Sequence, residues 1–124
     1  MARDPRRFDD LFAEFGRIEV RRMFGGEGIF ADKIMFGLVS DERVYLKTDE
    51  ETRKAYLAEG MKPFTYTKTS TGETMEISYY AVPDRLYDDP EEFAQWAHAA
   101  LRVAERSPTA LKKRRSKPKR GVLG

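Results

Sequence analysis

The chain has 124 residues, of which 40% are hydrophobic and 35% are charged, and a formal net charge of +2; these values are typical of one soluble globular domain. Cysteine is absent, which excludes disulfides, thiolate metal sites and a cysteine nucleophile. No apolar run approaches the ~18 residues that span a bilayer, and no hydrophobic stretch follows the charged N-terminus, so we expect a cytoplasmic protein without a membrane segment.

The first predicted element is a short amphipathic helix that ends before Gly16. Asp4 is a suitable cap, and Pro5 suits the first helical position. Four large apolar side chains follow at helical spacing: Phe8, Leu11, Phe12 and Phe15. Gly16 stands where a left-handed residue commonly ends a helix. The apolar stripe predicts that this helix packs onto a larger core.

Residues 18–48 have the two-residue period of strands. Ile18 and Val20 alternate with charged residues, and turn residues separate the later apolar runs at 31–33 and 41–42. Short connections favour antiparallel pairing, because a parallel crossover needs a dozen or more residues. This region therefore predicts a meander of three or four strands.

A second helix and two more strands follow this meander. The helix is predicted over residues 50–59, with Asp49 as its cap and Gly60 as its end. Residues 64–68 and 74–80 then have the composition of strands and are separated by a turn.

The last helix has the strongest local signal in the chain. Asp89, Pro90 and Glu92 supply a cap, a proline at the first position and a carboxylate at the third. The expected buried stripe of this helix is Phe93, Trp96, Ala97, Ala100, Leu101 and Ala104.

The resulting order is α-β-β-β(β)-α-β-β-α. Helices that interrupt antiparallel strands, each with one apolar face, predict an α+β fold: a two-layer sandwich with the helices on one face of the sheet. We expect one domain over residues 1–108 and a basic flexible tail over residues 109–124, which has no periodicity.

A glycine-rich segment, RRMFGGEGIF, is the first candidate site. Its candidate interaction turn comprises Arg22, Met23, Phe24, Gly25, Gly26 and Gly28. Clustered glycines can form an amide cradle for an anion, but the segment lacks the lysine and hydroxyl of a P-loop and joins two strands. We favour a bulge or tight bend in which only glycine tolerates the backbone angles.

Conventional catalytic, cofactor and metal sites are not predicted. The single histidine, His98, points off the apolar stripe of the last helix and has no evident partner base. Adjacent carboxylates occur mostly near helix N-termini, where they complement the helix dipole. We therefore assign no catalytic residue, no cofactor and no metal.

Tyrosines form a second candidate surface. Tyr79 and Tyr80 are adjacent and so face opposite sides of a strand, and Tyr45 and Tyr66 also have strand-like surroundings. A sheet face that carries tyrosines is typical of a partner or dimer surface, or of a platform for stacked bases. The alternative is ordinary cross-strand aromatic packing.

The tail is the only strongly basic part of the chain. Its candidate nucleic-acid contacts are Lys112, Lys113, Arg114, Arg115, Lys117, Lys119 and Arg120. Residues 1–110 hold 16 Lys and Arg against 21 Asp and Glu, a net charge of −5. The folded part is therefore expected to repel phosphates, and the tail is either a phosphate-binding arm or a solubilising extension.

Five segments in order resemble the N-terminal domain of the TfoX/Sxy family: RRMFGGEGIF, KIMFGLVSDERVYLKTD, GMKPFTY, MEISYYAVP and DDPEEFAQWAHAAL. The resemblance covers roughly residues 8–106 and implies an α+β fold of secretion-chaperone-like architecture. Full-length members carry a second domain and act as coactivators with the cyclic-AMP receptor protein at competence promoters. The family supplies no catalytic residues, and we expect this chain to be a stand-alone domain.

The leading functional hypothesis is a non-enzymatic regulatory and protein-interaction module. By resemblance, its partner belongs to the transcription machinery and it acts as a transcriptional co-regulator. The alternative is a nucleic-acid-associated protein that binds DNA phosphates through the basic tail. A homodimer is compatible with both hypotheses. A small-molecule role at the glycine turn is the third.

Overall fold

The computed structural model describes residues 8–23 and 26–106 of the chain. The strands are β1 (Glu19–Met23), β2 (Gly26–Ala31), β3 (Ile34–Ser40), β4 (Arg43–Lys47), β5 (Pro63–Thr67) and β6 (Thr74–Ala81). The helices are α1 (Arg53–Ala58), the short 3₁₀ helix η2 (Asp84–Asp88) and α2 (Pro90–Arg106). The strand meander, the later strand pair and the last two predicted helices are thus confirmed, while η2 was not predicted.

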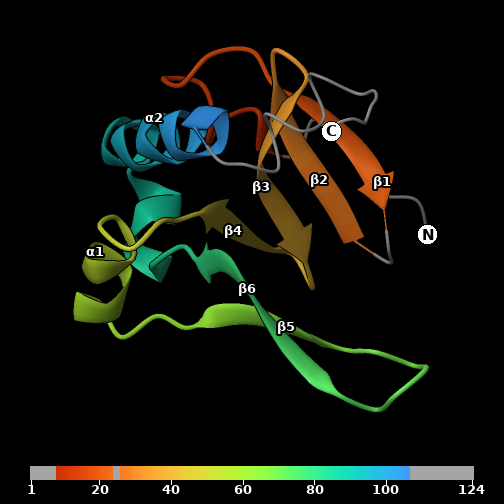
Figure 1. The fold of residues 1–124 in the computed structure, drawn as a ribbon. Coiled ribbons are helices and arrows are strands. Elements are labelled where there is room, and N and C mark those ends of the chain that lie inside the picture. The colour runs from red at the N-terminus through yellow and green to blue at the C-terminus, as the bar shows by residue number, and fades with distance from the viewer. Residues whose placement is uncertain (1–7, 24–25, 107–124) are drawn as a thin grey trace.

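All the strands belong to one antiparallel sheet with the order β1-β2-β3-β4-β6-β5. Figure 1 shows α2 lying across β3 and β4, while the β5–β6 hairpin extends away from the helices. The predicted α+β class is confirmed. Because β6 pairs with β4, the chain after α1 first forms the edge strand β5 and only then returns beside β4 as β6.

Two tight turns set the register of the central strands. Asp32 and Lys33 connect β2 to β3 with φ of 51° and 69°, and Asp41 and Glu42 connect β3 to β4 with φ of 53° and 61°. Two consecutive residues with positive φ form the two-residue turn whose twist matches that of paired strands. Both predicted turns are therefore confirmed, although neither contains a glycine.

The hydrophobic core lies between the sheet and α2. Phe36, Val39, Val44 and Leu46 project from β3 and β4 and are at most 1% exposed. The helix contributes Phe93, Ala97, Ala100 and Ala104, as predicted, together with Ala94 and Val103. Trp96 and Leu101 are only partly buried and pack against the edge of the core.

The predicted first helix differs from the structure. Asp4 and Pro5 lie outside the described residues, and residues 8–15 form a series of turns rather than a continuous α-helix. The Phe12 and Gly16 amides donate hydrogen bonds to the carbonyl oxygens of Phe8 and Phe12, each at 3.0 Å. The packing prediction holds, because Phe8, Leu11 and Phe12 are buried in the core.

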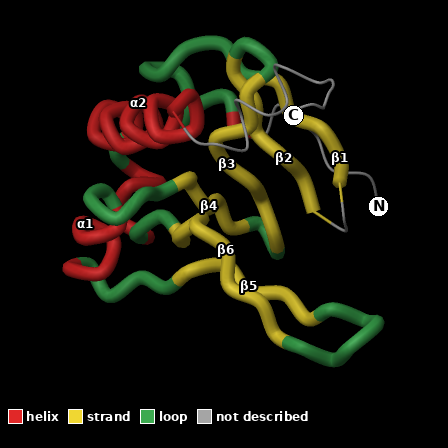
Figure 2. The backbone as a smooth tube through the Cα atoms, viewed as in Figure 1, coloured by secondary structure: helices red, strands yellow, loops and turns green. Residues whose placement is uncertain are grey.

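The second helix begins later than predicted. The Asp49 Oδ1 accepts hydrogen bonds from the amides of Glu51 (3.0 Å) and Thr52 (2.8 Å), and the α-helix itself starts at Arg53. Gly60 follows its end with φ of 79°, as expected for a residue that stops a helix. Helices and loops alternate along the left side of the sheet in Figure 2. Within the described ranges, no helix has both the length and the apolar character needed to cross a bilayer.

Candidate interaction surfaces

The candidate interaction turn lies where β1 and β2 meet. Arg22 and Met23 end β1, and Gly26 and Gly28 belong to β2. Met23 pairs with Gly26 across the two strands. Phe24 and Gly25 of the predicted turn lie outside the described residues.

Close approach, rather than backbone angle, explains the two described glycines. Gly26 and Gly28 are not among the residues with positive φ. A Cβ atom on Gly26 would lie 2.5 Å from the backbone oxygen of Val39 on β3. On Gly28 it would lie 2.7 Å from the Met23 Sδ and 2.9 Å from the Phe30 Cε1. Our expectation of special backbone angles is therefore wrong for these two positions, where the sheet leaves no room for a side chain.

The face of the sheet opposite the helices carries an apolar surface, which we call the open face. Its side follows from the register: Val39 pairs with Val44 on the core side, so their neighbours Leu38 and Tyr45, which also pair, lie on the other side. The open face comprises Met23, Phe30, Met35, Leu38, Tyr45, Phe64, Tyr66, Met75, Ile77, Tyr79 and Ala81. The open face therefore runs from β1 across the sheet to the β5–β6 hairpin.

Aromatic contacts connect the strands of the open face. The rings of Tyr45 and Phe64, from β4 and β5, meet edge to face at 5.1 Å across β6. The Arg21 guanidinium lies 4.8 Å from the centre of the Phe30 ring. Tyr79 has Lys47 Nζ at 5.2 Å from its ring centre, and burial raises the pKa of Tyr79 to about 12.

The predicted tyrosine surface is therefore divided between the two faces. Tyr45, Tyr66 and Tyr79 lie on the open face, whereas Tyr80 is buried on the core side against Tyr56, with ring centres 5.8 Å apart. Tyr66 is the most accessible of these tyrosines, at 43% exposed. The opposite orientation of Tyr79 and Tyr80 agrees with the prediction.

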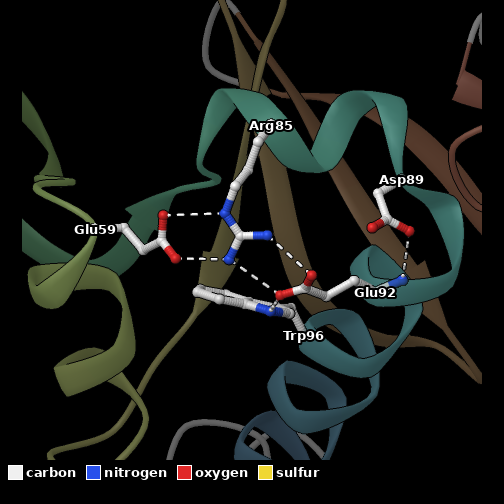
Figure 3. Close-up of polar contacts among 5 residues, drawn as sticks. All are labelled: Glu59, Arg85, Asp89, Glu92 and Trp96. Atoms are coloured by element: carbon white, nitrogen blue, oxygen red, sulfur yellow. Dashed lines mark hydrogen bonds and ion pairs between the residues drawn. The ribbon is translucent and has the colours of Figure 1, made fainter.

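A network around Arg85 joins three helical segments (Figure 3). Arg85 lies in η2, and its guanidinium donates to both carboxylate oxygens of Glu59, at 3.2 and 2.6 Å, just after α1. It also donates to Glu92 in the first turn of α2, at 2.9 and 3.0 Å. The Trp96 Nε1 donates to the same Glu92 carboxylate at 3.3 Å. Hydrogen bonds from Arg85 lower the pKa values of Glu59 and Glu92 and raise that of Arg85.

Beside this network lies a cleft of about 590 Å³, which we call the charged cleft. It is lined by Arg43, Tyr45, Glu59, Gly60, Met61, Lys62, Pro63, Ala81, Pro83, Asp84 and Arg85. Arg43 Nη1 is 2.9 Å from Asp84 Oδ1, and this hydrogen bond raises the pKa of Arg43. The charges on its walls are therefore mostly paired within the protein.

Sequence reasoning did not identify Arg85 or Arg43 as interacting residues. Arg85 meets Glu59 from 26 positions away, and Arg43 meets Asp84 from 41 positions away. A single exposed arginine has no periodic signal, and its partner is set only when distant elements come together. The Glu92 position was recognised as part of a cap, which is confirmed because its amide donates to Asp89 Oδ1 at 3.1 Å.

His98 differs from its predicted environment. Its ring centre lies 4.5 Å from that of Phe15, and the residue is partly buried rather than a free surface side chain. Among the described residues, no group of three or more His, Asp and Glu side chains is placed to hold a metal ion. The predicted basic contacts between Lys112 and Arg120 lie outside the described residues.

Comparison with known proteins identifies relatives. The family model of the TfoX N-terminal domain matches residues 10–104. The DNA transformation protein TfoX1 of Aliivibrio fischeri is 30% identical over 95 residues, which cover 77% of this chain and 44% of the relative. Protein Sxy of Escherichia coli K12 is 26% identical over 95 residues, with the same shares covered. The chain thus matches less than half the length of these curated relatives.

Proposed function

Because this chain belongs to the TfoX N-terminal domain family, we propose that it is a regulatory module that acts by binding a protein partner rather than by catalysis. The observation that carries the proposal is the family match over residues 10–104, which spans nearly the whole described fold. The partner is a component of the transcription machinery, and the module acts as a transcriptional co-regulator in the cytoplasm.

The charged cleft is the part of the surface that best fits such a partner. Tyrosine and arginine are the side chains that most often dominate binding energy at protein interfaces, and the cleft presents Tyr45, Arg43 and Arg85 together. The two arginines are held in place by Asp84, Glu59 and Glu92. Side chains that are ordered before binding lose less conformational entropy when a partner docks.

Lys62 provides the means to test this surface. It is exposed and lines the charged cleft, and its side chain has no ion-pair or hydrogen-bond partner among the residues that the structure describes. Lys68, at the far end of the same hairpin, is equally exposed and lies outside that lining. Lys62→Glu and Lys68→Glu therefore make the same change of charge inside and outside the cleft.

The experiment presents the immobilised full chain to RNA polymerase and transcription factors from the source organism. We expect retention of one of these components, loss of retention for Lys62→Glu, and unchanged retention for Lys68→Glu. Retention of none of these proteins by the unmodified chain contradicts the proposed function. If Lys62→Glu and Lys68→Glu retain the partner equally well, the cleft is not the binding surface, but the proposed function is not contradicted.

A second candidate function rests on the separation of charge along the chain. Residues 8–106, which contain the whole described fold, hold 13 Lys and Arg against 20 Asp and Glu. Residues 111–124 hold seven Lys and Arg and no acid. Clustered cations bind DNA phosphates without reading sequence, and salt weakens that binding. In this alternative the tail provides affinity for DNA.

The test of the alternative compares the full chain with a chain that ends at residue 110. At low salt the full chain binds DNA and the shortened chain does not, and the difference disappears at high salt. If neither form binds at low salt, the alternative fails. This result would leave the protein-binding proposal unaffected.

A further inference from the structure

The open face has the wrong composition for a surface that remains in water. An antiparallel sheet that is covered on one side normally presents polar side chains on its other side. Here the apolar residues Leu38 and Phe30 lie opposite the core, and Tyr66 on the same face is 43% exposed. The helices α1 and α2 both pack on the other face. Apolar patches of this kind mark interaction surfaces.

The β5–β6 hairpin shows most clearly that the side opposite the helices is the apolar one. On the side that faces the helix layer, its exposed residues are polar and include Thr65, Thr67, Thr74 and Glu76. On the open face it carries Tyr66, paired directly with Met75, and then Ile77 and Tyr79. The apolar side of the hairpin is therefore the side without a helix, although the hairpin extends beyond α2 (Figure 1).

The charges around this face disfavour a nucleic acid as its partner. Arg21 is paired with Glu19 at 3.2 Å, and Arg43 with Asp84 at 2.9 Å. The described residues as a whole are acidic, with 13 Lys and Arg against 20 Asp and Glu. A phosphate backbone would be repelled by that net charge. A second copy carries the same net charge, but at this face it meets apolar side chains, and salt screens the remaining repulsion.

We propose that the open face packs against the same face of a second copy of this chain, related by a two-fold axis. The occupant is a second copy because the face is apolar and its charged groups have partners within each chain. The arginines at its border are paired with carboxylates, and Lys47, beside Tyr79, donates to Ser78 Oγ at 2.8 Å. Two sheets pack face to face about 10 Å apart, with strands crossing at about 30°. The result would be a four-layer dimer with the helices outside.

The dimensions of the sheet are sufficient for this interface. Six strands at about 4.8 Å spacing give a width of about 24 Å, and strands of five to eight residues are about 17–26 Å long. The flat footprint is therefore roughly 400–600 Å². Because side chains make the accessible area larger than the footprint, this approaches the ~800 Å² per partner of a standard interface.

The test measures the mass of the full chain by sedimentation equilibrium and uses two matched double variants. Tyr66→Lys with Met75→Lys replaces a directly paired set of residues on the open face, and Thr67→Lys with Thr74→Lys replaces a directly paired set on the opposite face of the same hairpin. Both variants add two charges and place two lysines opposite each other. Any cost within the hairpin is thus similar in the two proteins.

We expect the unmodified chain and the threonine variant to be dimers, and the open-face variant to dissociate at least about 30-fold more readily, as for the loss of an interface hot spot. A monomeric unmodified chain across about 1–200 µM overturns the proposal. So does equal dissociation of the two variants. A monomer that binds a different protein through this face also overturns it.

A second measurement avoids any dependence on the lysine variants. The chain has no cysteine, so Tyr66→Cys and Thr67→Cys each introduce one thiol on opposite faces of β5. We expect alkylation of the Tyr66→Cys thiol to slow as protein concentration rises, whereas the rate for Thr67→Cys stays constant. Equal rates at all concentrations for both thiols contradict the dimer. This inference does not rest on the proposed function. The open face and the charged cleft share Tyr45 and Ala81, but the two tests change different residues.

Discussion

Replacing Phe12 by alanine tests whether the N-terminal turns are a structural part of the core. Phe12 is 2% exposed, and its ring meets those of Phe15, Phe36 and Phe93 edge to face at 5.7, 6.3 and 4.9 Å. Removing a buried phenylalanine side chain costs about 3–5 kcal/mol. For a domain whose total stability is about 5–15 kcal/mol, this is a large fraction.

The expected change in melting temperature follows from the size of the domain. At about 4–8 °C per kcal/mol for a domain of this length, the cost of about 3–5 kcal/mol for Phe12→Ala is expected to lower Tm by about 12–40 °C. Thermal and urea unfolding, followed by circular dichroism, measure the change. Leu57, which is 53% exposed, provides the control, since Leu57→Ala is expected to change stability by less than about 0.5 kcal/mol.

A double-mutant cycle then tests the contact itself. Phe12→Leu and Phe93→Leu retain most of the apolar volume but remove the edge-to-face pair, so the coupling between them is expected to be about 0.5–1.5 kcal/mol. If Phe12→Ala costs less than about 1 kcal/mol, or if the coupling is zero, the N-terminal turns do not pack on α2 as described.

Three further predictions concern the turns, the glycines and alkaline pH. Lys33 has φ of 69°, so Lys33→Gly is expected to stabilise the fold by about 1 kcal/mol in urea unfolding; a loss of stability would contradict this reasoning. Gly26→Ala is expected to cost about 1–3 kcal/mol and more than Gly28→Ala, because the new Cβ meets the rigid Val39 backbone rather than movable side-chain ends; the reverse order would argue against it. Burial raises the folded-state pKa of Tyr79 to about 12, above the unfolded value of about 10. Its contribution to stability is therefore present below pH 10 and lost as pH rises towards 12. The loss of stability between pH 10 and pH 12 should therefore be smaller in Tyr79→Phe than in the unmodified chain.

The Arg85 network shows how the helical segments are held relative to one another. Arg85 contacts Glu59 after α1 and Glu92 in α2 from its own position in η2, and all these side chains are partly exposed. Exposed ion pairs contribute little to stability individually. We therefore interpret the network as a means of fixing the walls of the charged cleft rather than as a main source of stability.

Local sequence determined the elements whose signals act over a few residues. The Asp89 cap, Pro90 and the alternation of Val44 and Leu46 predicted α2 and β4 correctly, because capping bonds and alternating burial depend only on near neighbours. The first helix was predicted by the same reasoning and is a series of turns in the described residues, where packing of Phe12 against Phe36 and Phe93 dominates over helical propensity.

Only the tertiary structure decided which surfaces exist. The sequence predicted strands and tyrosines, but the pairing of β4 with β6 places Tyr45 beside Ala81 and completes the open face. Likewise, the glycine segment was recognised from the sequence, but the space that Gly26 must leave free belongs to Val39 on a neighbouring strand. These features depend on contacts between residues far apart in the chain, and such contacts leave no local periodic pattern.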